Sequence, residues 1–522
     1  MNLLFKINLI FNTIKHLKLS QIYWQIIYRI KKKTSLNQTN NIIEIIPIYY
    51  QYYPEQKDKY LGENHFRFLN LEKKFDSSID WKYEEFGKLW NYNLEYFDYL
   101  QQEDINVKSR VDLLKDFYTF SIEHAKVLEP YPVSLRLINS IKFLSRYNIS
   151  DRFILNCLHQ EGQFLFKNLE YHILGNHLLE NGFALLLAGT YFQEEKWVRK
   201  AENLLKNELK EQIHQDGAHF ELSPMYHQII LFRVLELIDW YTCAGQNNEF
   251  NDFIKKVASR MLSFLEHISF ENGDIPHFND SATGIAYTTK ELVEYAKILG
   301  VSSYKLPLTD SGYRSLMNNN FEIKIDVAQL SVNYQPGHAH ADSLGFIMYY
   351  NKQPFLIEQG TSTYQINDRR ALERSSSAHN TVTIHQRNHS NVWSGFRVAE
   401  RAKTFIIEDH VNVIKAKHNG YVKPFSTWHE RHFKIDQKQF SIDDMLSSTR
   451  EGESHLHFAH GITPLLDGHL IRFKEIPVVI EVKNCSKILF EDYLQANGYN
   501  QYLKNRKALI RFTQHTTLIF QS

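Results

Sequence analysis

The sequence has few cysteines and almost no net charge. Its three cysteines among 522 residues lie far apart, at Cys157, Cys243 and Cys485. This spacing excludes a disulfide framework and a paired-cysteine metal site. The formal net charge is +1, so the field of the whole protein predicts no nucleic-acid partner. A polyanionic ligand would therefore need a local basic cleft.

A long apolar run is also missing, since no stretch is long and apolar enough to span a bilayer. Residues 1–33 carry basic side chains and no acid, but polar residues interrupt their apolar run and no small-residue cleavage site follows. A secretory signal is therefore not expected, and the expected location is the cytoplasm or the cell envelope. A basic amphipathic helix here could form a peripheral contact with an anionic membrane. The sequence favours the alternative, a helix packed against its own domain.

Aromatic residues are abundant, with 30 Tyr and 35 Phe. Core packing accounts for most of them, and an aromatic-lined cleft of the kind that binds saccharides would account for others. The length is too great for one hydrophobic core and predicts two or three domains.

Apolar residues repeat at helical spacing from about residue 85 to residue 305. Residues 227–238 place them at i, i+3, i+4 and i+7, and similar stretches cover residues 135–144, 178–187, 197–209 and 253–265. Gly and Asn separate these stretches. Many paired helices without intervening strands predict an all-helical layer or a toroid of helical hairpins.

After residue 320 the pattern changes to that of β-strands. Strands are predicted at residues 321–325, 381–384, 433–435, 440–442, 478–482 and 509–512. Strands that follow helices indicate an α domain and then an antiparallel β-sandwich. The predicted division is an N-terminal basic arm and lead-in at 1–80, a helical domain at 81–310 and a sandwich at 311–522.

Residues 337–342 read Gly-His-Ala-His-Ala-Asp and carry the densest functional signal in the chain. On an extended strand His338, His340 and Asp342 would point to one face, about 6.6 Å apart. Such a face suits a metal ligand beside a general base. A packed polar patch is the alternative.

The helical half contains two further polar clusters. Asn176, His177 and Glu180 lie in an apolar stretch, where they could serve a site or tie helices together. Ser223 and Pro224 predict the start of a helix. Tyr226 would then lie near the positive helix end, which favours a lowered phenol pKa and a role in acid–base chemistry, although a structural tyrosine is the commoner case.

The β half contains the predicted metal ligands. His340, Glu358 and His379 form a two-histidine, one-carboxylate set that suits zinc, with a fourth position open. Arg369, Arg370 and Arg374 precede His379 and could hold a carboxylate or sulfate, or form surface ion pairs.

These motifs together resemble the heparinase II/III family of polysaccharide lyases. The resemblance runs from about residue 81 to residue 402 and is most specific to alginate lyase-like members found with surface-polysaccharide genes. It rests on Leu-Trp-Asn-Tyr-Asn-Leu at 89–94, Gly-Asn-His at 175–177, Ser-Pro-Met-Tyr at 223–226, residues 337–342, the strand end at Gly360, Ala-His-Asn-Thr at 378–381 and residues 392–398. It implies an incomplete (α/α) toroid followed by an antiparallel β-sandwich.

The resemblance also implies β-elimination at a uronic acid of an acidic polysaccharide. Asn176 and His177 would hold the substrate carboxylate while a base removes the C5 proton. Tyr226 would protonate the leaving oxygen and, in syn elimination, would also be the base. His338 would be the base for the other stereochemistry, or would orient and deprotonate Tyr226.

By the same resemblance, one structural zinc per chain would be bound by His340, Glu358 and His379. Glu358 stands where relatives usually have aspartate, which puts metal occupancy in doubt. Asp342 would orient one of the imidazoles. The substrate-binding residues would be Trp90, Glu180, Tyr364, Arg370 and Arg374.

Two other functions fit parts of the sequence. A glycoside hydrolase would need two carboxylates across one bond, and Glu180, Glu221 and Asp216 are available. A non-catalytic glycan-binding or assembly protein would have no need of Tyr226 or His338. The sequence names neither the polysaccharide nor the oligomeric state.

Overall fold

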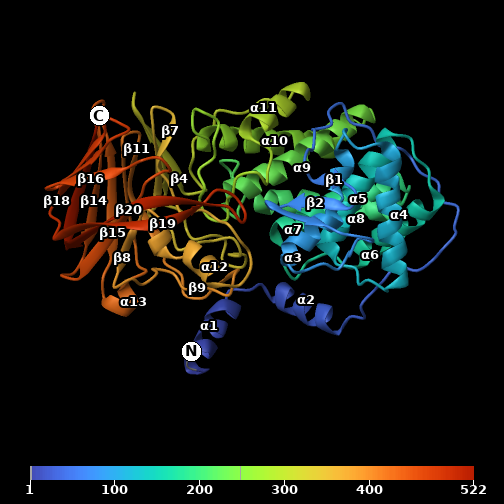
Figure 1. Cartoon of the computed structure of the whole chain (residues 1–522), viewed down its shortest axis with the longest axis horizontal. Helices are drawn as coiled ribbons and strands as arrows, with labels where there is room; N and C mark the ends of the chain where they lie inside the picture. The colour runs from blue at the N-terminus through green and yellow to red at the C-terminus, as the bar shows by residue number, and fades with distance from the viewer. Residues whose placement is uncertain (1–2, 247) are drawn as a thin grey trace.

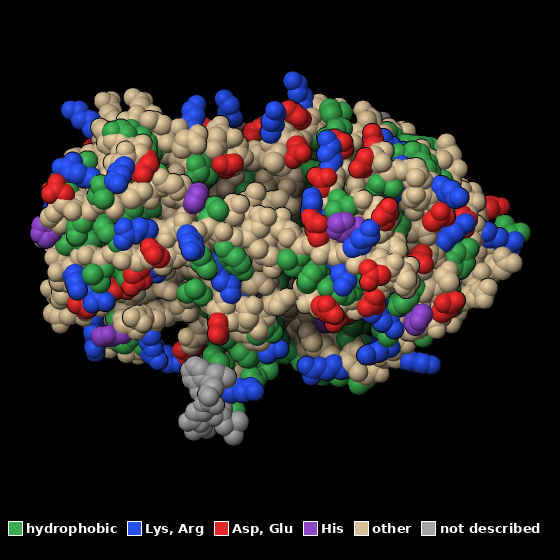
Figure 2. Space-filling view, in the orientation of Figure 1, with side chains coloured by type: hydrophobic (Ala, Val, Ile, Leu, Met, Phe, Trp, Pro, Cys, Tyr) green, Lys and Arg blue, Asp and Glu red, His purple; other side chains and the backbone are tan. Residues whose placement is uncertain are grey.

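The computed structural model describes residues 3–246 and 248–522, and it shows a helical half followed by a half of antiparallel strands (Figure 1). This arrangement confirms the predicted fold class, a helical toroid and then a β-sandwich domain. Among the described residues, no helix combines the length and apolarity that crossing a membrane requires. Acidic and basic side chains alternate over the face in Figure 2, in keeping with the net charge of +1.

The helical half consists of helices that follow one another without intervening long strands. The helices are α3 (Lys88–Tyr96), α4 (Val107–Glu123), α5 (Pro130–Arg146), α6 (Arg152–Lys167), α7 (Gly175–Tyr191), α8 (Glu195–Gln212), α9 (Pro224–Cys243), α10 (Glu249–Ile268) and α11 (Thr289–Ile298), with a 3-10 turn at Asp98–Gln101. Each helical stretch predicted from apolar spacing lies inside one of them. Side-chain caps begin several of these helices: Asn106, Asp151, Ser223, Asn248 and Thr288 each accept a backbone N–H.

The segment before residue 81 contains two helices, where the sequence predicted a helix within residues 1–33, and a small sheet that was not predicted. Two helices, α1 (Leu3–Ile14) and α2 (Leu19–Ile30), lie along the lower side of the molecule in Figure 1. A small sheet follows, made of β1 (Tyr60–Gly62), β2 (His65–Phe68) and β3 (Leu71–Lys74). Phe68 of this sheet packs edge-on against Trp90 of α3, with ring centroids 5.2 Å apart. The small sheet therefore extends the hydrophobic core of the toroid.

The second half contains three antiparallel sheets and the short β9–β10 pair. Its elements are β4 (Tyr313–Met317), β5 (Phe321–Asp326), β6 (Phe346–Tyr350), β7 (Gln353–Leu356), α12 (Asp368–Glu373), a 3-10 turn (Ser376–Ala378), β8 (Val382–Ile384), β9 (Val392–Trp393), β10 (Arg397–Val398), β11 (Thr404–His410), β12 (Val413–His418), α13 (Val422–Phe425), β13 (His429–Ile435), β14 (Gln439–Leu446), β15 (Glu451–His457), β16 (Pro464–Asp467), β17 (Leu470–Phe473), β18 (Val479–Lys483), β19 (Lys487–Ala496), β20 (Tyr502–Thr513) and β21 (His515–Gln521).

The strands of the second half form three sheets that differ in how far they are buried. The three sheets have the orders β4-β5-β6-β7, β19-β20-β15-β8 and β11-β12-β13-β14-β21-β18-β17-β16. Strands alternate buried and exposed residues where one face is solvated, as in β14, while β5 and β6 are buried throughout. All six predicted strand regions overlap observed strands.

The two halves meet through stacked aromatic rings. Phe270, after α10, stacks on Tyr349 of β6 with ring centroids 3.7 Å apart. Phe278 stacks on Tyr313 of β4 at 5.1 Å. These rings lie in one buried cluster that contains residues of both halves. The segment between α10 and α11, which carries Phe278 and then Asp280, is thereby held at the junction.

Candidate active site

The candidate site lies at this junction, around the N-terminus of α9. Ser223 caps α9 by accepting the backbone N–H of Tyr226 at 3.2 Å, and its hydroxyl donates to the backbone oxygen of Asp280 at 2.7 Å. Pro224 occupies the first helical turn, as predicted. The cap therefore fixes Tyr226 at the helix start and ties it to the segment from the junction.

Tyr226 contacts two residues of the β half. Its ring lies against the ring of His338, with centroids 3.9 Å apart. Its hydroxyl lies 3.1 Å from the hydroxyl of Tyr364. Burial raises the pKa of Tyr226 well above 10, the reverse of the lowering that the helix end alone predicted. At neutral pH the phenol is protonated, so Tyr226 can donate a proton.

The expected strand at residues 337–342 is wrong. These residues form turns, and β6 begins only at Phe346. The change of direction lets the two histidines separate: His338 faces Tyr226, and His340 points into the β half towards His379, with ring centroids 5.3 Å apart. The preceding Pro336-Gly337 pair is a turn signal in the sequence.

Both histidines bind the carboxylate of Asp280, which the sequence did not single out. The Nδ1 of His338 lies 2.9 Å from Oδ2 of Asp280, and the Nε2 of His340 lies 2.8 Å from Oδ1. Arg370 binds the same carboxylate with both terminal nitrogens, one of them at 2.6 Å. Burial alone would raise the pKa of Asp280, but Arg370 and the two imidazoles hold it well below its usual range. Asp280 is thus a charged acceptor that fixes both imidazoles.

The ionised Asp280 determines which ring nitrogen of each histidine carries a proton. A carboxylate can only accept, so His338 donates from Nδ1 and His340 donates from Nε2. The opposite nitrogen of each ring keeps its lone pair when the ring is neutral. For His338 this is Nε2, which faces Asn176 at 3.4 Å. His338 therefore presents a basic nitrogen to the side of the site that carries Asn176.

Asn176 lies at the start of α7, and Glu221 holds its side chain. Its side-chain nitrogen donates to both oxygens of Glu221, at 2.9 and 3.2 Å, and its backbone N–H donates to Oε1 at 3.2 Å. Gly175 has a φ of 59°, and a side chain at this position would collide with the Glu221 carboxylate. Burial opposes ionisation of Glu221, but His338, His219 and Asn176 outweigh it and lower its pKa. Glu221 is a positioning residue for Asn176.

His177 and Glu180 follow Asn176 on α7 but differ in what they contact. His177 is about a third exposed, and its Nδ1 lies 3.2 Å from Glu170. Burial disfavours its charged form, but Glu170 outweighs burial and raises its pKa, which suits a cation that meets a carboxylate. Glu180 is buried and ion-paired with Arg233 at 3.0 Å. Arg233 thus gives the Glu180 carboxylate a structural partner, and its predicted contact with substrate stays a prediction.

Three other predicted substrate contacts are also buried. Trp90 is fully inaccessible and donates to the backbone oxygen of Leu71 at 3.2 Å. Arg370 is bound to Asp280, and Arg374 donates to the backbone oxygens of Ala339 and Gly395. Trp90 belongs to the core of the toroid, and the two arginines hold the segments behind the site, so the structure gives these three side chains structural contacts.

Half-buried aromatic rings line the site, whereas Trp90 is fully buried. On the helical side Tyr96 and Tyr131 pack with centroids 6.0 Å apart. Burial raises the pKa of both phenols, and the proximity of Tyr226 adds to the rise. On the β side Tyr364 and the exposed ring of Phe396 lie 5.1 Å apart. Of the five predicted substrate-binding residues, Tyr364 therefore lies at the site. The aromatic rings offer faces on which sugar rings can pack.

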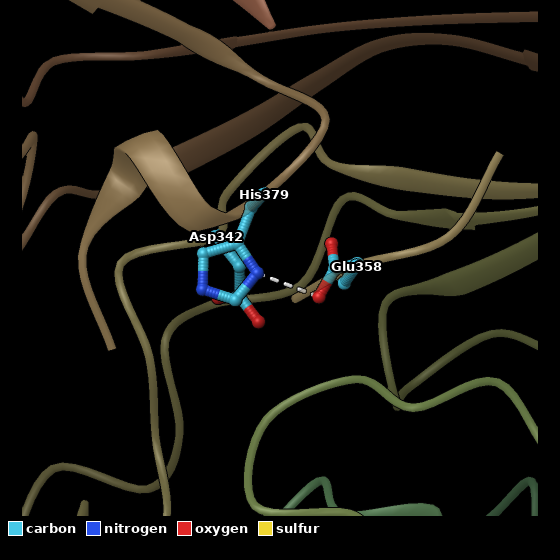
Figure 3. A group of neighbouring side chains, drawn as sticks. All are labelled: Asp342, Glu358 and His379. Carbon is cyan, nitrogen blue, oxygen red and sulfur yellow. Dashed lines mark hydrogen bonds and ion pairs between the residues drawn. The ribbon is translucent and has the colours of Figure 1, made fainter. Parts of the chain in front are cut away.

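A second group of polar side chains lies inside the β half, behind His338. Ligand atoms of Asp342, Glu358 and His379 lie within 4.8 Å of one another, and all three residues are buried (Figure 3). Nδ1 of His379 lies within hydrogen-bonding distance of Oε2 of Glu358, at 2.6 Å. Two members of the predicted metal set are thus together, but Asp342 takes the place predicted for His340. Nε2 of His340 binds Asp280 instead.

The unpaired atoms of this group fit a cation. Among the described residues, Nε2 of His379, Oε1 of Glu358, Oδ2 of Asp342 and Nδ1 of His340 are buried without a hydrogen-bond partner. Burial raises the pKa of Asp342 to about 6 and that of Glu358 well above its usual range, while it lowers the pKa of His379. A cation would compensate both carboxylates and use the lone pairs of the neutral imidazoles. The group can therefore hold a metal, with His340 beside it.

Comparison with known proteins identifies the family. The model of the heparinase II/III N-terminus matches residues 132–302, and that of the heparinase II/III-like C-terminal domain matches residues 303–510. A heparin-sulfate lyase of Bacteroides stercoris is 24% identical over 318 residues, which are 55% of this chain and 46% of that protein. The chain spans about half the length of the curated relatives that it matches.

Solved structures show the same fold. Heparinase III aligns with a TM-score of 0.68 at 16% identity, over 96% of this chain and 89% of that chain. A heparan sulfate lyase of Pedobacter heparinus aligns with a TM-score of 0.60 at 18% identity, over 88% and 81%. The two family models adjoin at residues 302 and 303 and leave no gap between the helical and the β half. The chain therefore belongs to the heparinase II/III-like family.

Proposed function

We propose that the chain is a polysaccharide lyase that cleaves a uronic-acid-containing polysaccharide by β-elimination. The observation that carries this proposal is the arrangement of His338. Its ring contacts Tyr226, its Nδ1 is fixed by Asp280, and its Nε2 faces Asn176. His338, Tyr226 and Asn176 would thus supply a base, an acid and an amide donor around one point. Such a site does not need the pair of carboxylates that a glycoside hydrolase uses.

His338 acts as the base in this mechanism. Its Nε2 takes the proton from C5 of the uronate, and the ionised Asp280 stabilises the imidazolium that forms. The electrons of the C5–H bond form the C4–C5 double bond as the bond from C4 to O4 breaks. Asp280 is a positioning residue, because it acts through His338.

Tyr226 supplies the proton that the leaving O4 needs. Burial keeps its hydroxyl protonated, and the Tyr364 hydroxyl at 3.1 Å stabilises the phenolate that remains. The products are an unsaturated uronate end and a new hydroxyl end. Solvent then returns a proton to Tyr226 and removes one from His338.

Asn176 neutralises the uronate carboxylate as charge develops on it. One N–H of its side chain is held by Glu221, while the other meets only the longer 3.4 Å contact with His338. A substrate carboxylate would replace that longer contact. The raised pKa of His177 makes it a second positive partner for the same carboxylate.

The contacts of the available carboxylates support elimination over glycoside hydrolysis. Glu180 is paired with Arg233, and Glu221 is bound by Asn176. Asp216 accepts the backbone N–H groups of Thr309 and Ser311 at 3.0 and 2.9 Å. A hydrolase would need two of these carboxylates at the scissile bond, and each has a structural partner.

The proposal includes one structural zinc held by Asp342, Glu358 and His379, with His340 beside them. When bound, zinc would compensate the charge of the two carboxylates. It would thereby fix the segment that carries His340 and Asp342. The donor set of imidazole nitrogens and carboxylate oxygens suits zinc. No step of the elimination uses this metal.

The test is a screen of the full chain against uronate polymers, including heparan sulfate and alginate, followed by ultraviolet absorbance. Elimination gives a conjugated double bond that absorbs, and we expect such a rise with at least one polymer. Tyr226→Phe should abolish it, and Tyr304→Phe, an exposed tyrosine, should not. New reducing ends without absorbance would show a hydrolase, and polymer binding without any cleavage would show a glycan-binding protein.

A further inference from the structure

The helices α1 and α2 are amphipathic, but on α2 it is the polar side that faces the protein. Gln21 and Gln25 donate to the backbone oxygens of Tyr334 and His172, both at 3.2 Å. Tyr28 donates to the backbone oxygen of Leu169 at 2.9 Å. The hydrogen-bonding side chains of α2 therefore hold it on the toroid.

The opposite side of α2 is apolar and open to solvent. Leu19, Tyr23, Ile26 and Ile30 are 84%, 57%, 55% and 74% exposed. Their spacing of four, three and four residues places them on one helix face. An apolar stripe normally faces the core, so this stripe lacks the covering that its composition calls for.

The neighbouring helix α1 continues the apolar surface. Its exposed large residues also follow helical spacing: Ile7, Ile10, Phe11 and Ile14. Leu9 and Asn12 are its buried residues, and Trp393 of β9 donates to Thr13 at 3.2 Å. Two consecutive helices thus each attach to the body and each leave an apolar face outward.

Positive charge surrounds this surface. Residues 1–43 contain no acid, and the first acidic side chain is Glu44. Among the described residues, six cations of this segment form no ion pair: Lys6, Lys15, Arg29, Lys31, Lys32 and Lys33. Figure 2 shows Lys and Arg gathered along the lower edge, where Figure 1 places α2.

We propose that the exposed faces of α1 and α2 bind an anionic lipid surface. Apolar side chains rimmed by lysine and arginine fit the boundary between headgroups and acyl chains. Each cation near an anionic leaflet adds to the attraction. A second copy of this chain fits less well, because a symmetric contact would bring two acid-free basic segments together. This attachment is independent of the proposed lyase activity.

The test uses the full chain and vesicles that are sedimented after mixing. Binding is expected to vesicles of phosphatidylcholine with phosphatidylserine, with little binding to phosphatidylcholine alone, and added salt should weaken it. The double variant Ile26→Ser/Ile30→Ser should bind at least about tenfold more weakly, because two apolar anchors are lost. The control Ile407→Ser/Val411→Ser removes two exposed apolar residues of the distant β half and should bind like the parent.

A charge pair separates lipid binding from other occupants. Lys32→Gln/Lys33→Gln should weaken binding about thirtyfold, while the exposed pair Lys487→Gln/Lys504→Gln should change it little. Failure of the parent to bind anionic vesicles would overturn the proposal. A stable dimer that Ile26→Ser/Ile30→Ser dissociates would overturn it as well, since the apolar face would then be an interface between copies.

Discussion

Replacing Asp280 with asparagine removes the one negative charge that Arg370, His338 and His340 share. The carboxylate is fully buried and accepts from all three side chains. An amide has one accepting oxygen and one donating nitrogen. At least one imidazole would then face an N–H group, and Arg370 would lose its counter-charge.

Two separate losses follow from this geometry. Leaving Arg370 buried without its partner should lower the free energy of unfolding by about 3–5 kcal/mol. If the new amide donates to Nδ1 of His338, the ring proton moves to Nε2 and the base is lost. The comparable change of tautomer in a serine protease lowers kcat by about 10⁴-fold, so a loss of kcat of about 10³–10⁴-fold is expected for Asp280→Asn, with a small change in KM.

The assay follows ultraviolet absorbance of the unsaturated product, with the fold verified by circular dichroism at the assay temperature. The matched control is Asp239→Asn. Asp239 is also fully buried and accepts backbone N–H groups of Gln51 and Tyr52, but it lies on α9 and contacts neither His338 nor Arg370. This control should lose stability and keep kcat. The reasoning about His338 is refuted if folded Asp280→Asn retains kcat within about threefold of the parent.

Three further predictions concern a backbone position, the metal and pH. Gly175→Ala should lower both activity and stability, by about 1–3 kcal/mol of unfolding free energy, because the methyl group collides with Glu221 at a positive φ; denaturant titration measures this. Metal analysis of the purified chain should find about one zinc, and a chelator should lower the melting temperature; a metal content near zero contradicts the assignment. Acid should destabilise the fold, because burial lowers the pKa of His219 to about 4 and of His227 and His389 to about 3. Since unfolded histidines protonate near pH 6.5, these three histidines together should lower the stability by up to about 4 kcal/mol per pH unit as pH drops from about 6 to about 4. Melting curves that do not change between pH 7 and pH 4 would contradict this.

Local patterns predicted the elements well, because helical and strand spacing are properties of neighbouring residues. The cap at Ser223 and the first-turn Pro224 were predictable for the same reason. The segment 337–342 is the exception: its alternation suggested a strand, and the turn signal of Pro336-Gly337 outweighed that alternation.

The contacts that organise the site could not be predicted in this way. Asp280 meets His338 across 58 residues, His340 across 60 and Arg370 across 90, so no spacing rule relates them. Residue type also gave no sign that Trp90 and Arg370 are buried. Arg370 is buried only because Asp280 compensates its charge, a contact that only the fold creates.

The shared carboxylate would couple the protonation of His338 to the affinity of the Asp342, Glu358 and His379 group for a metal. If His338 becomes an imidazolium, its charge competes with His340 for the Asp280 carboxylate, and the ring of His340 lies 5.3 Å from that of His379. A ligand that binds the protonated form of His338 more tightly would then change the dissociation constant of the metal. By linkage, the metal would change the dissociation constant of that ligand by the same factor. A titration of metal with and without a bound acidic oligosaccharide would measure this coupling directly.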